Sequence, residues 1–339
     1  MSHAMNIVRA LVASVCVTTV PAAASESDEP RATADLRAKL LDDTSLAAAL
    51  KVTASPAPIV LQAQPADAGE EEEEGGIADN SFLIEEAYNQ EPGVVQHIFN
   101  WVRGWSWEGG RSRTFDFVFT QEWPIHSQTH QFSYTVPLST AFDHPDGEPS
   151  TDVEDFDDVL LNYRYQMWAE TDCCPAFSPR FSVILPTGDE HEGFGTGEVG
   201  YQINLPLSKE IDDWAYHFNA GLTVTPNVEV GVAPAIDFGG RTLNGYNLGA
   251  SAIWLADKDL NFLFEALALW DEELTDDGSE DHTFEVYLSP GVRWAPYTSG
   301  STQWVLGLGL PIGLTEDSTD VALFFYMSFE HPFRECAGN

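Results

Sequence analysis

Two pairs of acidic and histidine residues have the types and the spacing that acid–base chemistry requires. Asp189 precedes His191 by two positions, and Asp281 lies directly before His282. A carboxylate that orients an imidazole produces a general base, as hydrolytic enzymes require. Both pairs are more typical of solvated loops, and the sequence contains no Gly-x-Ser-x-Gly, no His-Glu-x-x-His and no phosphate-binding Gly-rich loop with Lys. We therefore expect no enzyme, no cofactor and no metal site.

Four other charged residues lie in segments where apolar residues recur at every second position. Arg164 and Arg180 are on two neighbouring segments, and Glu265 and Glu285 are on two later ones. A period of two is that of a β-strand, and it turns these charges to the face opposite the apolar residues. Charges there must be solvated or paired, because an isolated ion in a dry interior is too costly. Their role therefore depends on how the strands are arranged.

The alternation of apolar and small or polar residues continues from one segment to the next. In residues 304–314 every even position is large and apolar, whereas the odd positions are mostly Gly. Residues 284–294 and 216–224 likewise separate apolar from polar or small side chains. A soluble β-sandwich also alternates, but its outward face would be polar. An apolar face backed by a polar or small one is typical of a strand between lipid and a lumen.

We predict an all-β fold, a transmembrane antiparallel up-and-down β-barrel of about twelve strands, with roughly ten to fourteen as the range. If the N-terminus is periplasmic, the inner connections are short, whereas the outer ones, such as 142–156 and 226–244, are long. Short periplasmic turns and long external loops are the rule for such barrels. The predicted strands are residues 94–107, 113–123, 130–141, 157–169, 176–186, 199–208, 215–225, 245–256, 260–270, 282–295, 302–314 and 321–333.

In a ring of about twelve strands, Arg164 and Arg180 would face Glu265 and Glu285 almost diametrically. This arrangement predicts a constriction at which a basic wall faces an acidic wall, and such a transverse field orders dipolar solutes. The alternative is that the four side chains meet, pair and fill a lumen that is only modestly wide.

The residues before the barrel change character twice. A basic start, a short apolar run and small residues form a signal peptide, and an acidic, Pro-rich stretch with room for a short helix at 34–52 follows it. Next comes a predicted capped helical turn, ended by Pro92-Gly93, which either plugs the barrel or only leads into it. The predicted divisions are a signal peptide (1–24), a mostly disordered acidic linker (25–78), a lead-in or plug segment (79–92), the barrel (93–333) and a C-terminal tail (334–339).

The net charge of −39 limits the partners of the chain. Nucleic acid and anionic lipid headgroups are poor partners for so acidic a protein. Acidic residues far outnumber Arg111 and Arg241 in the predicted external loops. Like charges held close together favour divalent cations, although solvation of the surface is the commoner role of acidic loops. We therefore expect divalent cations to bind at these loops, although the loops contain no defined calcium motif.

Aromatic residues mark one end of the predicted strands. Several Trp residues lie at or near periplasmic strand ends, where their rings favour the membrane interface. Trp168 lies at the same level, but alternation turns it inward. Phe329 and Phe333 end the last strand, as in the assembly signal that barrel-assembly machinery reads, although a short tail follows. The predicted aromatic girdle consists of Trp123, Trp214, Trp254, Trp294 and Trp304.

The cysteines leave two alternatives open. Cys173 and Cys174 are adjacent in a predicted periplasmic turn, and Cys336 is in the tail. A disulfide from either one to Cys336 is compatible with an oxidising compartment, and free thiols are the other alternative. The spacing is not the Cys-x-x-Cys of a redox or zinc site.

Six stretches carry a resemblance to a known family: residues 79–97, 119–124, 161–165 (Leu-Asn-Tyr-Arg-Tyr), 185–188 (Leu-Pro-Thr-Gly), 289–293 (Ser-Pro-Gly-Val-Arg) and 328–333 (Ser-Phe-Glu-His-Pro-Phe). Together they resemble a family of Gram-negative outer-membrane barrels labelled as transporters or by the meta-pathway of phenol degradation. The resemblance covers about residues 79–333, implies an aromatic or hydrophobic solute, and carries no known site.

The expected function is that of an outer-membrane channel or passive transporter for small solutes. Its expected partners are outer-membrane lipid, the barrel-assembly machinery and a small-molecule solute. The alternative is a structural barrel with a closed lumen, whose acidic loops and linker bind partners or divalent cations. Inward-facing Tyr287 and Tyr326 suit both interpretations.

Overall fold

The structure is a computed structural model, and it describes residues 77, 81–107, 110–145, 151–190, 194–228, 240–274 and 280–333. The predicted signal peptide, the linker apart from Ile77, and the C-terminal tail lie outside the described residues. Within the described residues, no helix is long and apolar enough to cross a membrane.

The described chain consists of β-strands joined by turns and loops. The strands are β1 (Val94–Ser106), β2 (Gly110–Ile125), β3 (Ser127–Pro145), β4 (Thr151–Phe156), β5 (Val159–Tyr165), β6 (Ala176–Phe177), β7 (Arg180–Leu185), β8 (Gly200–Asn204), β9 (Leu207–Ile211), β10 (Trp214–Val228), β11 (Arg241–Asp257), β12 (Leu260–Leu274), β13 (Glu280–Ser299), β14 (Thr302–Gly309), β15 (Ile312–Gly313) and β16 (Val321–Pro332).

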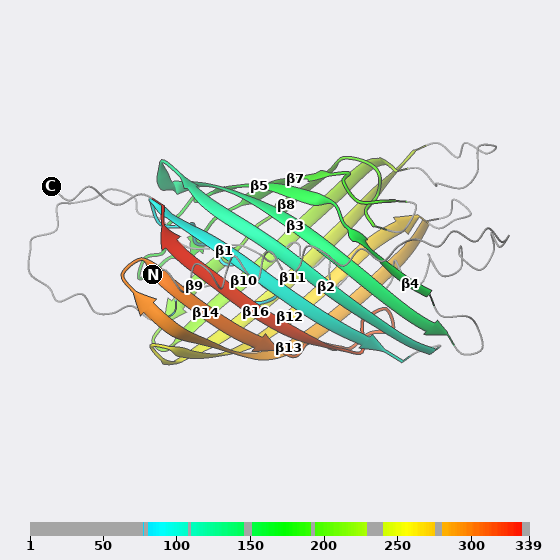
Figure 1. Cartoon of the computed structure of the whole chain (residues 1–339). Coiled ribbons are helices and arrows are strands. Elements are labelled where there is room, and N and C mark those ends of the chain that lie inside the picture. Colours follow the sequence, from blue (N-terminus) through cyan, green and yellow to red (C-terminus); the bar gives the residue numbers. More distant parts are fainter. Residues whose placement is uncertain are drawn as a thin grey trace, which may run out of the picture. The chain divides into compact units, whose positions relative to one another are not determined.

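These segments form a closed barrel of twelve antiparallel strands, which confirms the predicted fold class. The first and last strands close it, since β1 pairs with β16 from Val94↔Pro332 to Trp105↔Val321. In Figure 1 the cyan β1 accordingly lies beside the red β16. This pairing joins the two ends of the sheet, and a sheet closed in this way is the kind that can lie in lipid.

Four of the twelve strands are each interrupted once, so that sixteen segments make twelve strands. Pro179 separates β6 from β7, Pro206 separates β8 from β9, and Pro311 separates β14 from β15. A proline has no N–H to donate, and it therefore breaks a ladder locally. The fourth interruption, between β4 and β5, falls at Asp157 and Asp158.

Most connections at one end of the barrel, here called the turn end, are very short, with residues 166–175 between β5 and β6 as the exception. The connections at the opposite end, here called the loop end, are mostly longer. His126 alone joins β2 to β3, with a positive φ of 64°. At the loop end, several strands run further than predicted. Glu272 and Glu273 of β12, for example, still pair with His282 and Asp281 of β13. Apolar alternation ends where lipid ends, but hydrogen-bonded pairing does not, so the pattern underestimated these strands.

The outward face of the barrel is apolar. Leu248 of β11 and Phe264 of β12 are each at least 55% exposed although they belong to regular strands. So large an apolar exterior is unfavourable in water and favourable in lipid. The inward face carries buried polar residues such as Asn162 and Gln202 on one side and an apolar cluster on the other.

Candidate functional site

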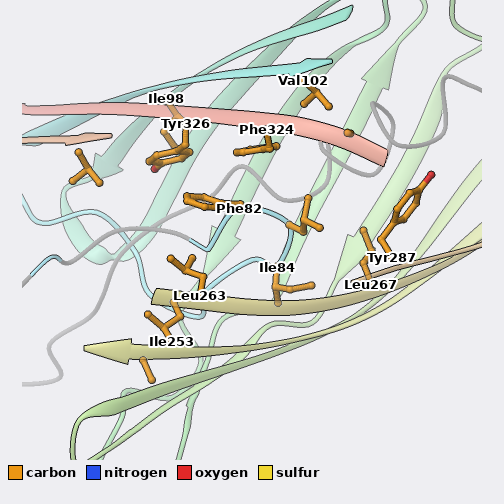
Figure 2. Packing of buried hydrophobic residues seen from close by; sticks show 14 of the residues in the cluster. Phe82, Ile84, Ile98, Val102, Ile253, Leu263, Leu267, Tyr287, Phe324 and Tyr326 are labelled. Carbon is orange, nitrogen blue, oxygen red and sulfur yellow. The ribbon is translucent and has the colours of Figure 1, made fainter. Parts of the chain in front are cut away.

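Residues 81–91, here called the inner segment, lie inside the barrel. Phe82, Leu83 and Ile84 are at most 1% exposed, and they belong to the same buried cluster as inward-facing wall residues. Figure 2 shows Phe82 beside Tyr326 and Phe324, and Ile84 at the strand that carries Leu267. The inner segment therefore occupies the lumen.

The predicted helical turn in this segment is wrong, because residues 81–91 contain no helix. The N–H groups of Leu83 and Ile84 donate to Oε1 of Glu265, at 2.9 and 3.3 Å. The N–H of Ala87 donates to Oγ of Ser208 at 2.7 Å. Wall side chains thus satisfy the donors that a helix would direct to its own carbonyls.

The carboxylate of Glu85 is the most strongly held group of the inner segment. Nε of Arg180 donates to its Oε1 at 2.9 Å and to its Oε2 at 3.1 Å. Arg164 contacts Oε1 through Nη2, and Asn204 contacts Oε2 through Nδ2. We call Arg164, Arg180 and Asn204 the carboxylate clamp. All four side chains are at most 2% exposed.

Three adjacent strands position the carboxylate clamp. Arg164 lies on β5, Arg180 on β7 and Asn204 on β8, and Arg180 pairs with both others in register. The alternation of the three strands turns each side chain inward. Inward-facing neighbours fix the Arg180 guanidinium, which donates to Oδ1 of Asn162 at 3.1 Å, to Oε1 of Gln202 at 3.0 Å and to Ser182.

A second carboxylate of the inner segment faces different partners. Oε1 of Glu86 lies 3.6 Å from Nε2 of His217 and 3.8 Å from Nη1 of Arg293. These distances are longer than those at Glu85, and His217 adds charge only when it is protonated. Glu85 therefore has the closer ion contacts of the two in the bonds described, and closer pairs bind more strongly.

Phe82 fills a flat space on the wall opposite the carboxylate clamp. We call this space the ring slot. Its ring centroid lies 5.2 Å from that of Phe324 and 5.5 Å from that of Tyr326. A Cβ added to Gly307 would lie 2.4 Å from the Phe82 ring, and one added to Gly291 would lie 2.7 Å from it. The small inner face noted in residues 304–314 is thus the floor on which this ring rests.

The structure turns all four predicted lumen charges inward. Arg164 and Arg180 hold Glu85, whereas Glu265 accepts the backbone of the inner segment on the far wall. Glu285 accepts a hydrogen bond from the Tyr287 hydroxyl at 2.5 Å. Arg164, Arg180 and Glu265 therefore contact the inner segment, whereas the described bond of Glu285 lies within its own strand. The constriction between two charged walls stays a prediction. Sequence reasoning missed Glu85 itself, although it lay within the predicted lead-in or plug segment.

Solved structures with similar folds are outer-membrane barrels. An outer membrane channel from Pseudomonas putida F1 matches with a TM-score of 0.52 and 11% identity, over 71% of this chain and 97% of that chain. The β-domain of the Bordetella autotransporter BrkA matches with a TM-score of 0.43 and 11% identity, over 72% and 100%. No family model and no curated protein matches. The chain has the fold of a Gram-negative outer-membrane β-barrel.

The five Trp residues of the predicted girdle all lie at the turn end. Trp214 pairs directly with Trp254, and their ring centroids are 6.5 Å apart. Trp294 is half exposed, and Trp123 and Trp304 are partly exposed. Their role at a membrane interface remains a prediction.

The inward placement predicted for Trp168 is wrong. Its side chain is 57% exposed, and its ring packs at a tilt against that of Phe177 with centroids 5.1 Å apart. The reason is that β5 already ends at Tyr165. Alternation beyond the end of a strand no longer fixes the direction of a side chain.

Phe329 and Phe333 both contact aromatic residues near the turn end. The ring centroid of Phe329 lies 4.8 Å from that of Trp304, and the centroid of Phe333 lies 5.2 Å from that of Trp123. These contacts join the last strand to β14 and β2. They are compatible with either a structural role or an assembly signal.

We expect Phe333→Ala to leave secretion intact and to lower the yield of folded barrel several-fold. If the ring belongs to the assembly signal, its loss slows insertion before folding. Heat-modifiable protein in the membrane fraction, measured by gel mobility, gives the yield. Trp123→Ala is the matched control, because it removes the same ring contact and keeps the terminal Phe. Normal yield of the Phe333 variant would contradict the assignment.

The remaining sequence candidates form no recognisable site in the described residues. Oδ1 of Asp281 accepts the backbone N–H of His282 at 2.8 Å, and His191 lies outside the described residues. Cys173 and Cys174 are exposed with their Sγ atoms 3.4 Å apart. Hydrogen bonds with the Cys174 thiol and the Thr171 hydroxyl lower the pKa of Cys173. Cys336 lies outside the described residues, so the predicted disulfide stays a prediction.

Proposed function

We propose that this protein is an outer-membrane channel or passive transporter for small solutes, and that the inner segment closes its lumen. One observation carries this proposal. The backbone of the inner segment bonds to wall side chains, and none of the strand pairings in the described residues includes residues 81–91. The segment can therefore leave the lumen without breaking the barrel ladder.

The lining of the lumen supports solutes with an apolar part. The ring slot and the residues around it, such as Ile98 and Leu263, form an apolar wall opposite the polar wall of the carboxylate clamp. A solute crossing between these walls meets a site for an aromatic or aliphatic group. The resemblance to transporters of the phenol-degradation label agrees with such a solute.

The test is single-channel recording in a planar bilayer. Wild-type protein is compared with a variant in which residues 25–91 are deleted and the signal peptide is joined to Pro92. We expect small or rare current steps from wild type and frequent, several-fold larger steps from the variant, because the lumen loses its filling. A correctly folded deletion variant that never conducts would overturn the channel proposal.

A structural barrel with acidic loops is the second candidate. The filled lumen favours it, and Nη1 of Arg241 lies 2.8 Å from Oε1 of Glu280 at the loop end, so loop charges do interact. The described residues contain no group of three His, Cys, Asp or Glu that could hold a metal ion. Cation binding therefore rests on the acidity of the loops as a whole.

If divalent cations bridge the loops, millimolar calcium should raise the thermal stability of the barrel and slow cleavage of its loops. The physical reason is that a divalent ion reduces repulsion among carboxylates that lie close together. Melting curves and limited proteolysis with calcium, and with equal ionic strength of sodium chloride as the control, measure this. Equal values in both salts would remove the cation proposal.

A further inference from the structure

The carboxylate clamp is a built site whose occupant does not belong to the wall. Its donors come from three strands of the barrel, whereas Glu85 comes from the inner segment, which takes part in none of the strand pairings of the described residues. Two guanidiniums and a carboxamide around one carboxylate exceed what a surface ion pair provides. The geometry resembles that of a ligand site more than that of a single contact.

The Arg180 part of the clamp is held from within the wall, independently of Glu85. Asn162, Ser182 and Gln202 hold the Arg180 guanidinium from within the wall, and none of them contacts Glu85 in the bonds described above. An empty clamp would place two buried cationic groups beside a polar wall. A carboxylate matches the fork of a guanidinium in shape and in charge, so an anion of this kind is the favoured replacement.

The inner segment also presents an apolar group at a fixed separation from this carboxylate. Phe82 precedes Glu85 by three residues, which span at most about 10 Å of extended chain. Its ring rests in the slot floored by Gly291 and Gly307, on strands nearly opposite those of the clamp. The segment therefore bridges the lumen with an aromatic ring at one wall and a carboxylate at the other.

We propose that the carboxylate clamp binds organic acids with an apolar body, and that Phe82 and Glu85 occupy this site as an internal surrogate until such an acid displaces them. The inference names a solute class and in that respect rests on the proposed channel function. Binding itself requires no open pore, so it can be measured separately. The competing interpretation is that Glu85 is only a latch, with no ligand to replace it.

Removing the surrogate carboxylate should expose the site. We expect Glu85→Ala to bind 4-phenylbutyrate with an apparent Kd about 100-fold below that of wild type, because the competing occupant is gone. Isothermal titration calorimetry on the mature full-length barrel in detergent measures this. Glu86→Ala is the matched control, since it removes the neighbouring carboxylate but leaves Glu85 in the clamp, and its Kd should stay near the wild-type value.

Three further titrations of the Glu85→Ala protein define the ligand class. The neutral amide 4-phenylbutanamide, acetate and inorganic phosphate should each bind at least about tenfold more weakly than 4-phenylbutyrate. Adding Arg164→Ala to the Glu85→Ala variant should abolish the gain. If Glu85→Ala does not fold, Glu85→Gln, which keeps the shape of the side chain and removes its charge, replaces it.

The outcomes separate this inference from the channel proposal. A folded Glu85 variant that binds 4-phenylbutyrate no better than wild type overturns the inference and leaves Glu85 as a latch, even if the deletion variant conducts. Phosphate or acetate binding as tight as that of 4-phenylbutyrate overturns the proposed ligand class. Tight carboxylate binding by a barrel that never conducts supports the site and rejects the channel.

Discussion

Two sets of substitutions in the same ion cluster are expected to open the lumen with opposite ionic selectivity. Glu85→Ala removes the carboxylate that Arg164 and Arg180 both contact, and the double substitution Arg164→Ala with Arg180→Ala removes the two guanidiniums. Breaking a buried ion pair from one side costs about 3–5 kcal/mol. The inner segment bears this cost, because it takes part in none of the strand pairings of the described residues. We therefore expect it to undock while the barrel ladder stays intact.

The charge left in the lumen then decides the selectivity. Glu85→Ala retains two cationic side chains on the wall and should favour anions. The double arginine variant removes them and should favour cations. The free-energy cost of about 3–5 kcal/mol changes the ratio of docked to undocked segment by more than about 100-fold. The conductance should therefore rise in both variants.

Single-channel conductance and the reversal potential in a salt gradient measure both effects. Glu86→Ala is the control, because its partners His217 and Arg293 lie farther from it, and it should open the lumen much less. Unchanged conductance and selectivity in the double arginine variant would mean that the inner segment does not obstruct the path. The same selectivity in both open variants would mean that these charges do not line it.

The barrel was predictable because a strand in the membrane needs an apolar outward side chain at every second residue, and this pattern recurs from strand to strand. Residues 284–294 satisfy it in full, and their pairing in β13 follows. The ends of the strands were less predictable. Beyond the lipid the outward side chains need not be apolar. Glu272 and Asp281 therefore looked like loop residues, although they belong to extended strands.

The site was less predictable than the fold because its contacts join residues far apart in the sequence. The glycines of residues 304–314 showed only that the inner face there has little bulk, and the residue that packs on it, Phe82, precedes them by more than two hundred residues. Alternation likewise indicated that Arg164 and Arg180 point inward. It contained no information about Glu85, which lies in a segment without periodicity.

The predicted helical turn failed for a related reason. The residues around Leu83 and Ala87 have acceptable helix propensities and a Pro-Gly terminator. Such a short helix is marginal in isolation, since its first turns gain few hydrogen bonds for the dihedral angles they fix. Inside the barrel, Glu265, Asn219 and Ser208 offer the backbone better acceptors. Tertiary contacts with the wall therefore replaced local structure.

Gly307→Leu is expected to expel Phe82 from the ring slot. A Cβ at this position would lie 2.4 Å from both Cε1 and Cζ of Phe82, which is closer than real contacts allow. The strand backbone is fixed on both sides by pairing with Arg293 and Tyr326, so the ring must move. Overpacking typically costs about 1–3 kcal/mol, and the ring also loses its burial, worth roughly another 2 kcal/mol. The segment should then undock.

Chymotrypsin digestion measures the undocking, because cleavage after Tyr88 requires the inner segment to leave the lumen. We expect Gly307→Leu to be cleaved there quickly and wild type to be protected. The compensating variant Gly307→Leu with Phe82→Ala should recover much of the protection, since the leucine fills the volume that the ring vacates while Glu85 still engages the carboxylate clamp. Heat-modifiable gel mobility confirms that the barrel of each variant is folded. Rapid cleavage of the compensating variant would show that a change in the β14 wall, and not the clash with Phe82, released the segment.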